Sequence, residues 1–453
     1  TVVDKQFGSY AEWYYATVYG NYGGNKDSFH KKVYGNKEYR EFGYDFKAEL
    51  FDPDSFAGII KNSGARYAVL TSKHHDGFCL WGTDNVHKVN WNSADIGPHR
   101  DLVKELSESI RKKGIKFGLY YSIIDWESVP SHRCDGRYFI PMKDVKKYDS
   151  SMKALATRAS SGEIIQDLSK ITQNFWGGSA DLFSSNKTDI KDEKGFSDEN
   201  SCGRNIFYGV REFAMAAIGN GIIAHGGSFH HVSTFFVFAD YLKAAIRLSA
   251  LSGHALTYVF THDSIAVGED GPTHEPIEQL AMLRSIPNNI VIRPADANET
   301  RLGWKIALES QNTPVILSLT RQNLPNLKQT ENLQDINRGA YVIKDCENPE
   351  LILIATGSEV SLALDVSKKL EEENKKVKVV SMPSMELFRM QEDSYKEEIL
   401  PKNVKKVSIE MASTFGWSEF TGDDGLNIGI DRFGISGKGG EVQEELGFSV
   451  EKI

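Results

Sequence analysis

Two hydrophobic patterns alternate along residues 44–126, one with helical spacing and one of short continuous runs. The helical pattern covers 52–64 and 100–114, and the short runs cover 65–72 and 115–122. Apolar residues at i, i+3 and i+4 predict helices, while short apolar runs between turn signals predict buried strands. Such an alternation is typical of parallel sheets. Residues 127–153 then mix Pro, Gly, Ser and charge, which indicates a connector with a junction near Tyr148.

From residue 154 the same alternation returns and continues to the end of the chain. It predicts helices at 160–171, 209–219, 238–251 and 275–285, and strands at 174–178, 255–262, 290–294, 314–320, 377–384 and 404–413. Residues 351–370 predict a strand, a glycine turn and a helix, whereas the polar stretch 324–338 resembles a linker. The chain is therefore predicted to be α/β, with a partial (β/α) barrel fragment at 1–148 followed by two parallel-sheet α/β domains at 149–328 and 329–453.

The composition narrows the possible partners. The 453 residues have a net charge of −9, which argues against nucleic acid or an anionic membrane as the main partner. No apolar run approaches the roughly 18 residues of a membrane span. The four cysteines are far apart in the sequence, which predicts no zinc site and no disulfide framework, and favours a cytoplasmic setting. Because Thr1 is not a natural start, we expect a cut or processed N-terminus.

A histidine pair follows the strand predicted at 65–72. His74 and His75 stand in TSKHHDGFCLW, with Trp81 close behind. In (β/α) barrels, residues at the carboxyl ends of strands form the active site, although a lone histidine pair on a loop is more often structural or solvated. Four stretches resemble the α-L-fucosidases that retain configuration. They are residues 42–81, WNSADIGPHRDLV (91–103), FGLYYS (117–122) and AEW (11–13). The resemblance implies that His74 and His75 bind fucose hydroxyls and that Trp81 and Tyr121 line the pocket.

The fucosidase resemblance lacks its catalytic pair. A retaining glycosidase needs two carboxylates about 5 Å apart. In this family the nucleophile is an Asp on a later strand, next to a Trp in the sequence. The most similar sequence in this chain is Cys134-Asp135-Gly136, which has no Trp. The family's early His-Trp-Gly strand is also missing. We therefore expect a barrel fragment without hydrolytic machinery.

The loop THDSIAVGEDGPTHEP (261–276) has the densest group of titratable residues. His262, Asp270 and His274 are spaced by Gly and Pro, a composition that favours proton handling and sugar binding over packing. Upstream, Glu212 opens the helix predicted at 209–219. By itself, an acidic residue there is explained by the helix dipole. Phe235, Phe238 and Tyr241 follow at i, i+3 and i+6 and predict one aromatic helix face, which a core stripe would also produce.

These motifs resemble transketolase from about residue 154 to the C-terminus, including IEMAS, FGW and GIDRFG (429–434). The resemblance implies a two-carbon ketol transfer between phosphorylated sugars through thiamine diphosphate, in domains of the thiamine-diphosphate-enzyme type. Glu212 would bond N1′ of the cofactor's aminopyrimidine, which Phe235, Phe238 and Tyr241 would cradle, with Asp181 near the thiazolium. The resemblance also implies that Arg158, Ser185 and Arg321 hold the substrate phosphate. His262, Asp270 and His274 would contact the sugar hydroxyls or the reacting carbon, with catalytic roles for His262 and His274.

The transketolase resemblance is also incomplete. The diphosphate and its Mg²⁺ need a domain with Gly-Asp-Gly and a downstream Asn, and the chain has no Gly-Asp-Gly. The residues therefore predict no metal site in this chain, and a homodimer or a partner chain bearing that domain. Three readings remain open: a transketolase half that needs a partner, a glycoside hydrolase acting on L-fucosides, and a non-catalytic sugar-binding fusion or artefactual chimera.

Overall fold

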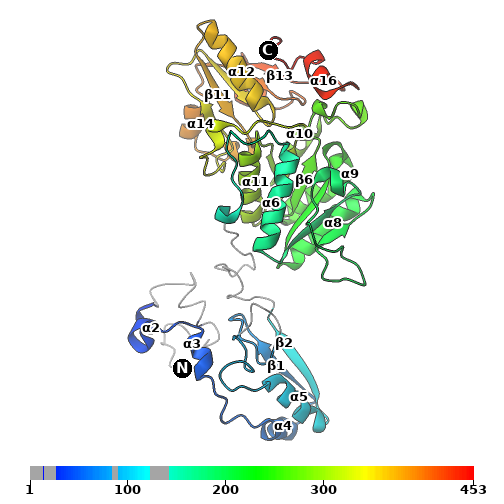
Figure 1. Cartoon of the computed structure of the whole chain (residues 1–453), viewed down its shortest axis with the longest axis vertical. Helices are drawn as coiled ribbons and strands as arrows, with labels where there is room; N and C mark the ends of the chain where they lie inside the picture. The colour runs from blue at the N-terminus through cyan, green and yellow to red at the C-terminus, as the bar shows by residue number, and fades with distance from the viewer. Residues whose placement is uncertain (1–13, 15–26, 84–89, 123–141) are drawn as a thin grey trace. The chain divides into compact units, whose positions relative to one another are not determined.

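The computed structural model describes residues 14, 27–83, 90–122 and 142–453, in two compact units (Figure 1). One unit spans Thr1–Phe139 and the other Ile140–Ile453. Cys134-Asp135-Gly136 and residues 11–13, which entered the fucosidase comparison, lie outside the described residues.

The first unit is built around a pair of parallel strands. Its elements are α2 (Asp27–Tyr34), α3 (Glu41–Asp45), α4 (Pro53–Asn62), β1 (Tyr67–Lys73), α5 (Leu102–Lys112) and β2 (Lys116–Tyr121). Each of the two packed helices begins at an aspartate cap: Asp52 accepts from the backbone of Asp54 and Ser55, and Asp101 accepts from that of Lys104. The α4–β1–α5–β2 order agrees with the hydrophobic pattern.

Among the described residues of this unit, helices α4 and α5 cover one face of the strand pair. Ala57, Leu106 and Ile110 of α4 and α5 form a small core to which Ala68 and Leu70 contribute from β1. Because side chains alternate along a strand, Tyr67 and Val69 point the other way and are 70% and 57% exposed. The first unit therefore presents an apolar sheet face to solvent.

The second unit begins with a six-stranded parallel sheet in the order β4-β3-β5-β6-β8-β7. Its strands are β3 (Phe175–Ser179), β4 (Asn205–Phe207), β5 (Phe229–Phe235), β6 (Thr257–Thr261), β7 (Ile290–Ile292) and β8 (Val315–Leu319). Its helices are α6 (Thr157–Ile171), α7 (Phe183–Asn186), α8 (Glu212–His225), α9 (Ala239–Ser252), α10 (Gln279–Arg284) and α11 (Ala297–Glu309). Figure 1 shows α6 beside α11 and α8 beside α9, and both pairs are in contact.

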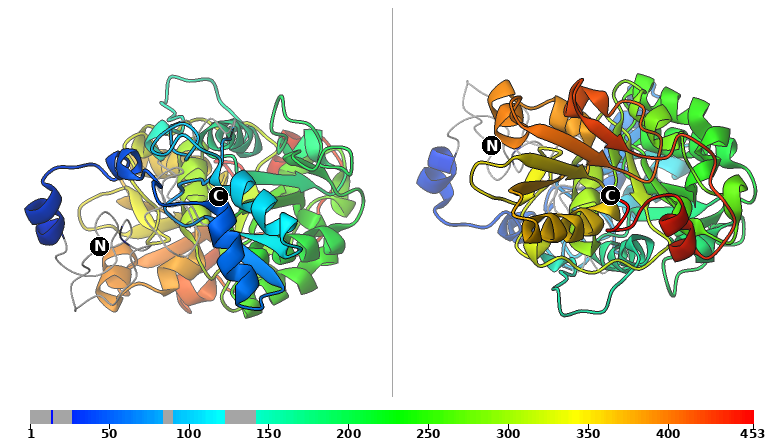
Figure 2. Two further views of the ribbon diagram at one scale, coloured as in Figure 1. Left: turned by 90° about the horizontal axis from the view of Figure 1, so that it is seen from below. Right: turned by 90° about the horizontal axis from the view of Figure 1, so that it is seen from above.

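A second sheet of five strands follows, in the order β13-β12-β10-β11-β9, with only β9 antiparallel. Its strands are β9 (Tyr341–Lys344), β10 (Leu351–Ala355), β11 (Val377–Ser381), β12 (Lys405–Ile409) and β13 (Leu426–Ile428). Its helices are α12 (Glu359–Glu372), α13 (Met385–Arg389), α14 (Asp393–Ile399), α15 (Ser418–Thr421) and α16 (Gly439–Glu445). One core lies between the sheet and α12, and another lies on the opposite face under α13 to α15 (Figure 2).

The sequence analysis missed two buried elements of the first sheet. Strand β5 is fully buried between β3 and β6, but its residues FHHVSTF are largely polar and conceal the strand pattern. Helix α11 contains buried Asn298 and Glu299, so that its pattern is not amphipathic either. In both elements buried polar residues conceal the apolar signal, and some of them form hydrogen bonds within the protein, as where the Tyr208 hydroxyl meets His230 Nε2 at 2.8 Å.

The described residues contain neither a membrane-spanning helix nor a cluster of metal ligands. None of the helices within them has the length and apolarity needed to cross a membrane. No group of three or more His, Cys, Asp or Glu side chains in that part of the chain could hold a metal ion.

Candidate active site

The residues predicted for catalysis and substrate binding gather at the carboxyl end of the first sheet. Phe235 ends β5, His262 directly follows β6, and Arg321 follows β8 two residues after Leu319. Because the strands are parallel, these ends meet at the same edge of the sheet, where open α/β sheets bind ligands. The topology thus explains why residues almost ninety positions apart form one group.

Arg158, at the second position of α6, reaches the histidine at this edge. Its Nη1 donates to the backbone oxygen of Ser185 at 2.7 Å and lies 3.4 Å from Nε2 of His262. Burial, together with the positive charges of Arg158, Arg321 and His274, lowers the pKa of His262 to about 3. Burial and the charge of Arg321 also lower the pKa of Arg158. The group therefore combines two arginines with an uncharged imidazole, which suits a phosphorylated ligand.

An aromatic row borders this histidine. The Phe235 ring lies 3.7 Å from that of His262, Phe235 stacks on Phe238 at 6.2 Å, and Phe238 stacks on Tyr241 at 5.8 Å. His274 meets Phe238 edge-on at 5.6 Å. The three aromatic residues come from three successive elements of the chain. Phe235 ends β5, Phe238 ends a 3-10 turn and only Tyr241 is in α9, yet the strand-to-helix turn still aligns the three rings.

The loop after β6 is shaped by the C-terminal sheet domain. Gly268 and Gly271 have φ of 80° and 70°, and a Cβ at Gly268 would meet Gly439 and Gly437 at about 3 Å. The Ser436 hydroxyl donates to the backbone oxygen of Glu269 at 2.7 Å. Asp270 and His274 are in this loop, so their placement depends on residues more than 160 positions away.

Two residues predicted to bind the cofactor, Glu212 and Asp181, take no part in the contacts around His262 described above. Glu212 is the first residue of α8, as predicted, but it is half-buried, and its carboxylate forms no hydrogen bond or ion pair with the residues that the structure describes. Asp181 follows β3 in a left-handed conformation and is exposed. Near Glu212 the surface is apolar, because Phe207, Val210 and Phe213 are half or more exposed.

The four sugar-binding residues predicted in the first unit also lie together, after β1 and at the end of β2. His74 and His75 have ring centroids 4.1 Å apart, and Trp81 lies 6.1 Å from Tyr121. His75 Nδ1 hydrogen-bonds to Ser122 directly after β2. Burial lowers the pKa of His75, and His74 and Lys73 add to the effect. The imidazoles and the aromatic rings thus form one patch.

A buried ionic network next to the site was missed in the sequence. Arg293, fully buried after β7, donates to Asp263 at 2.9 Å and pairs with Glu359 at the start of α12. A second arginine, Arg284, forms two 2.7 Å hydrogen bonds to Glu410. The two partners of each ion pair lie at least 30 residues apart in the sequence, so no local motif indicated these pairs.

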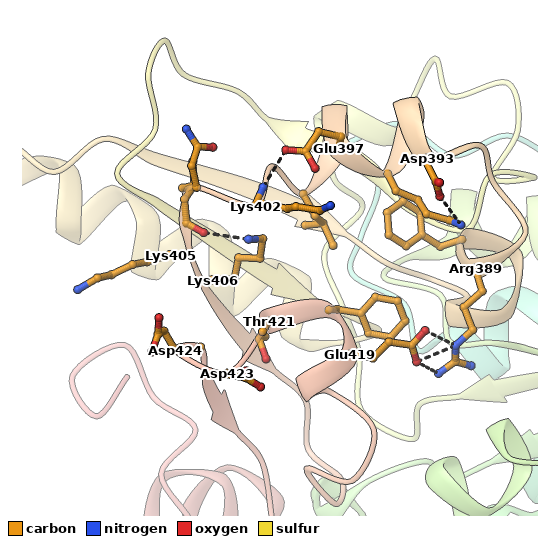
Figure 3. Close-up of a pocket in the computed structure, with 18 residues that line it drawn as sticks. Arg389, Asp393, Glu397, Lys402, Lys405, Lys406, Glu419, Thr421, Asp423 and Asp424 are labelled. Carbon is orange, nitrogen blue, oxygen red and sulfur yellow. Dashed lines mark hydrogen bonds and ion pairs between the residues drawn. The ribbon is translucent and has the colours of Figure 1, made fainter.

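A pocket of about 1310 Å³ lies elsewhere, wholly in the C-terminal sheet domain (Figure 3). It is lined by residues between 388 and 425 and by none of the predicted site residues. Two ion pairs lie in its lining: Arg389 binds Glu419 at 2.7 Å, and Lys396 lies 3.6 Å from Asp393. Because this pocket contains none of the predicted residues, the carboxyl edge of the first sheet is the better candidate site.

Three family models match parts of this chain. Residues 153–326 match the family model "Transketolase, pyrimidine binding domain", and residues 339–449 match "Transketolase-like TK C-terminal domain". Residues 2–164 match the model "Alpha-L-fucosidase". Two families thus match different parts of the chain, with a short overlap at 153–164.

Individual relatives show the same likeness. A transketolase of Staphylococcus epidermidis is 44% identical over 421 residues, covering 92% of this chain and 58% of the relative. A transketolase of Bacillus subtilis is 54% identical over 368 residues, covering 80% and 52%. The chain therefore spans about half the length of the curated relatives it matches.

Solved structures complete the comparison. Transketolase of Pichia stipitis in complex with sedoheptulose-7-phosphate matches with a TM-score of 0.68 and 40% identity, over 78% of this chain and 51% of that one. A split-gene transketolase chain, described as an inactive β4 tetramer, matches with a TM-score of 0.55 at 24% identity, over 66% of this chain and 96% of that one, which shows the fold alone. Residues 153–326 and 339–449 are therefore the pyrimidine-binding and C-terminal domains of the transketolase family.

Proposed function

We propose that residues 149–453 form the substrate- and pyrimidine-binding half of a transketolase, which transfers a two-carbon ketol unit between phosphorylated sugars. The observation that supports this most is the group at the sheet edge, where Arg158 and Arg321 act on a buried, uncharged His262. An arginine pair matches phosphate oxygens, and imidazoles match sugar hydroxyls.

The individual roles follow from the chemistry of the side chains. Arg158 and Arg321, with Ser185 next to them, would hold the substrate phosphate. Asp270 and His274, on the loop after β6, would bind sugar hydroxyls beside His262. His262 and His274 would also act at the reacting carbon, where the uncharged ring of His262 would form a hydrogen bond.

The aromatic row fits a thiamine cofactor. Phe235, Phe238 and Tyr241 form stacked rings, and Tyr241 is 65% exposed, so that a flat aminopyrimidine has a ring surface to lie against. Bound thiamine diphosphate supplies the nucleophilic carbon to which the two-carbon unit is attached during transfer. Glu212 would share a proton with N1′ of the aminopyrimidine, and Asp181 would lie near the thiazolium.

The diphosphate and Mg²⁺ would be held by another chain or a further domain. Exposed apolar side chains of α8 and α9 support such a partner, because large uncovered apolar areas mark interaction surfaces: Phe213, Ile218, Leu248 and Leu251. A partner on this surface would also bury Glu212, and burial raises a carboxyl pKa towards the range that proton sharing needs. The split-gene transketolase supports the idea that a half-length chain of this fold can assemble with others.

We further propose that residues 1–148 are a fucosidase-type barrel fragment fused to this half, with sugar-binding groups but no hydrolytic pair. The observation that favours it is the patch of His74, His75, Trp81 and Tyr121. Hydroxyls can bind the imidazoles, and the Trp81 ring can cover an apolar sugar face. Isothermal titration with L-fucose tests this surface, and absence of binding at millimolar sugar would refute it.

The transketolase proposal is tested by complementation. The purified chain is mixed with a protein bearing a thiamine diphosphate-binding domain of the matching type, with Mg²⁺, a ketose phosphate and an aldose phosphate. We expect ketol transfer only in the mixture, and a large loss of transfer in the Arg321→Ala variant. No transfer from a mixture in which the two proteins demonstrably associate would contradict the proposal.

A further inference from the structure

The apolar side chains of the loop 261–276 and its end belong to the core of the C-terminal sheet domain. Ile265 within the loop and Ile277 just after it are buried in the same apolar cluster as Leu353 of β10 and Val360 of α12. Because protein interiors are closely packed, a loop that contributes to such a core takes its position from it. The edge of the first sheet is therefore shaped partly by the other sheet domain.

A buried arginine joins the start of this loop to the C-terminal sheet domain. Arg293 directly follows β7, is fully buried, and donates from Nε to Oδ2 of Asp263 at 2.9 Å. The same guanidinium pairs with Glu359, the first residue of α12, and donates from Nη1 to the Thr356 hydroxyl at 2.9 Å. Because the guanidinium is a rigid planar fork, the groups that hold its Nη end also fix the direction of Nε.

The turn between β10 and α12 is shaped around this guanidinium. A Cβ built on Gly357 would meet Cζ of Arg293 at 2.8 Å and Nε at 2.9 Å. Gly357 also has a φ of 54°, which a residue with a side chain seldom adopts. Its backbone N–H donates to the Arg293 backbone oxygen at 3.1 Å. Arg293 therefore lies in a fitted seat of the C-terminal sheet domain.

Asp263 follows a residue whose backbone needs support. His262 has a φ of 64°, in the left-handed region, which non-glycine residues keep only where the surrounding structure holds them. The place of its ring depends on this backbone: the ring lies 3.7 Å from that of Phe235, and Nε2 lies 3.4 Å from Nη1 of Arg158. Without the bond to Asp263, the backbone at His262 can relax and the ring can leave these neighbours.

We propose that Arg293 is a positioning residue for substrate binding: seated on Glu359, it holds Asp263 and so keeps the ring of His262 against Phe235 and Arg158. The C-terminal sheet domain thereby acts on the substrate site without touching the substrate. The effect on the substrate rests on the proposed function, whereas the placement of the ring does not.

The main experiment measures the ring contact directly by NMR. The full chain is deuterated except at its histidine and phenylalanine rings, and the nuclear Overhauser effect (NOE) between His262 and Phe235 is assigned by its loss in His262→Gln and in Phe235→Leu. The contact between His231 and Phe175, whose rings stack at 5.2 Å in the core of the same sheet, is the internal standard.

Two variants cut the link in different ways. Arg293→Lys keeps the charge but loses the fork, so that one ammonium cannot hold both carboxylates in the native geometry. Asp263→Ala removes the carboxylate and leaves Arg293 paired with Glu359. In both variants we expect the NOE between His262 and Phe235 to fall severalfold, while the standard contact in the core remains.

The matched control is the same change at a neighbouring buried arginine. Arg284 forms two 2.7 Å bonds to Glu410 rather than to Asp263, so Arg284→Lys should keep the NOE between His262 and Phe235. An equal loss in this control would show a general loosening and overturn the inference. An intact NOE in folded Arg293→Lys would also overturn it, and Asp263→Ala decides by the same criterion if the lysine variant does not fold.

Kinetics test the effect on the substrate. In the complemented enzyme, Arg293→Lys should raise KM for the sugar phosphate about tenfold, since a left-handed backbone is disfavoured by about that factor at a residue with a side chain. The effect on kcat should be smaller, and Arg284→Lys should leave KM unchanged. A native KM in Arg293→Lys would refute the role in substrate binding. If the native mixture shows no ketol transfer, the proposed function fails, while the NOE still decides the placement of the ring.

Discussion

Replacing Arg293 by methionine should strongly destabilise the second unit, because this arginine joins its two sheets. Its Nε donates to Asp263, which follows β6, and its two Nη groups pair with Glu359 in the C-terminal sheet domain. Nη1 also donates to the Thr356 backbone oxygen at 3.1 Å. Burial alone would lower the pKa of Arg293, but Glu359 and Asp263 outweigh it and raise the pKa, so the guanidinium is charged.

The magnitude follows from what the substitution leaves behind. Methionine fills much of the same space, but Asp263 and Glu359 remain buried without their cation. Removing one partner of a buried ion pair costs about 3–5 kcal/mol of unfolding free energy. The matched control is Arg389→Met, whose ion pair with Glu419 is partly exposed and should cost at most about 1 kcal/mol.

Urea unfolding followed by tryptophan fluorescence measures this difference. Trp304 is buried in the first sheet domain and Trp417 in the C-terminal one, so both sides of the network contribute to the signal. We expect a loss of several kcal/mol for Arg293→Met, partly recovered when Glu359→Gln is added, because the second change removes one stranded charge. A loss below about 1 kcal/mol, equal to that of Arg389→Met, would refute the reasoning.

Three further predictions concern other parts of the chain. Burial raises the pKa of Glu275 from 4.5 to about 7, so the ionisation of this carboxyl destabilises the fold as pH rises through this range. The Glu275→Gln variant should therefore have a higher melting temperature than the native chain at pH 8 but not at pH 4. Equal shifts of the melting temperature at both pH values would contradict this prediction. Residues 1–148 expressed alone should be insoluble or poorly ordered, because Tyr67 and Val69 leave an apolar sheet face uncovered, and a cooperative thermal transition would argue otherwise. The purified chain should not hydrolyse aryl α-L-fucosides above background, and turnover lost on Asp76→Asn or Asp135→Asn would show that the assignment of acids was mistaken.

The sequence predicted elements with a clear apolar pattern, either helices with one buried face or strands that are apolar throughout. Helices α5 and α12 and strands β6 and β8 fall within a few residues of their expected positions. Strand β5 was missed because His230, His231 and Ser233 occupy buried positions that an apolar pattern would have marked. A periodicity argument cannot detect such a strand.

The sequence predicted which residues belong to the candidate site but not how they are arranged in space. The composition of the loop 261–276 indicated its chemistry, and the parallel topology of the sheet places His262 and Arg321 at one edge. The ion pair of Arg293 with Asp263 and the hydrogen bond between Asn186 and Thr261 join residues 30 and 75 positions apart, which no local pattern contains.

The central claim is that the first sheet domain binds the aminopyrimidine of thiamine diphosphate and activates it through Glu212. The most direct test is C2 proton exchange of the bound cofactor, measured by NMR in the complex with a protein that supplies the diphosphate-binding domain. Glu212→Ala should keep the fold, because a half-exposed acidic residue at a helix start contributes about 1 kcal/mol or less. We predict fast exchange with glutamate at position 212 and exchange slowed by orders of magnitude in Glu212→Ala. Equally fast exchange in both would show that Glu212 is only structural and that the assignment of this site is wrong.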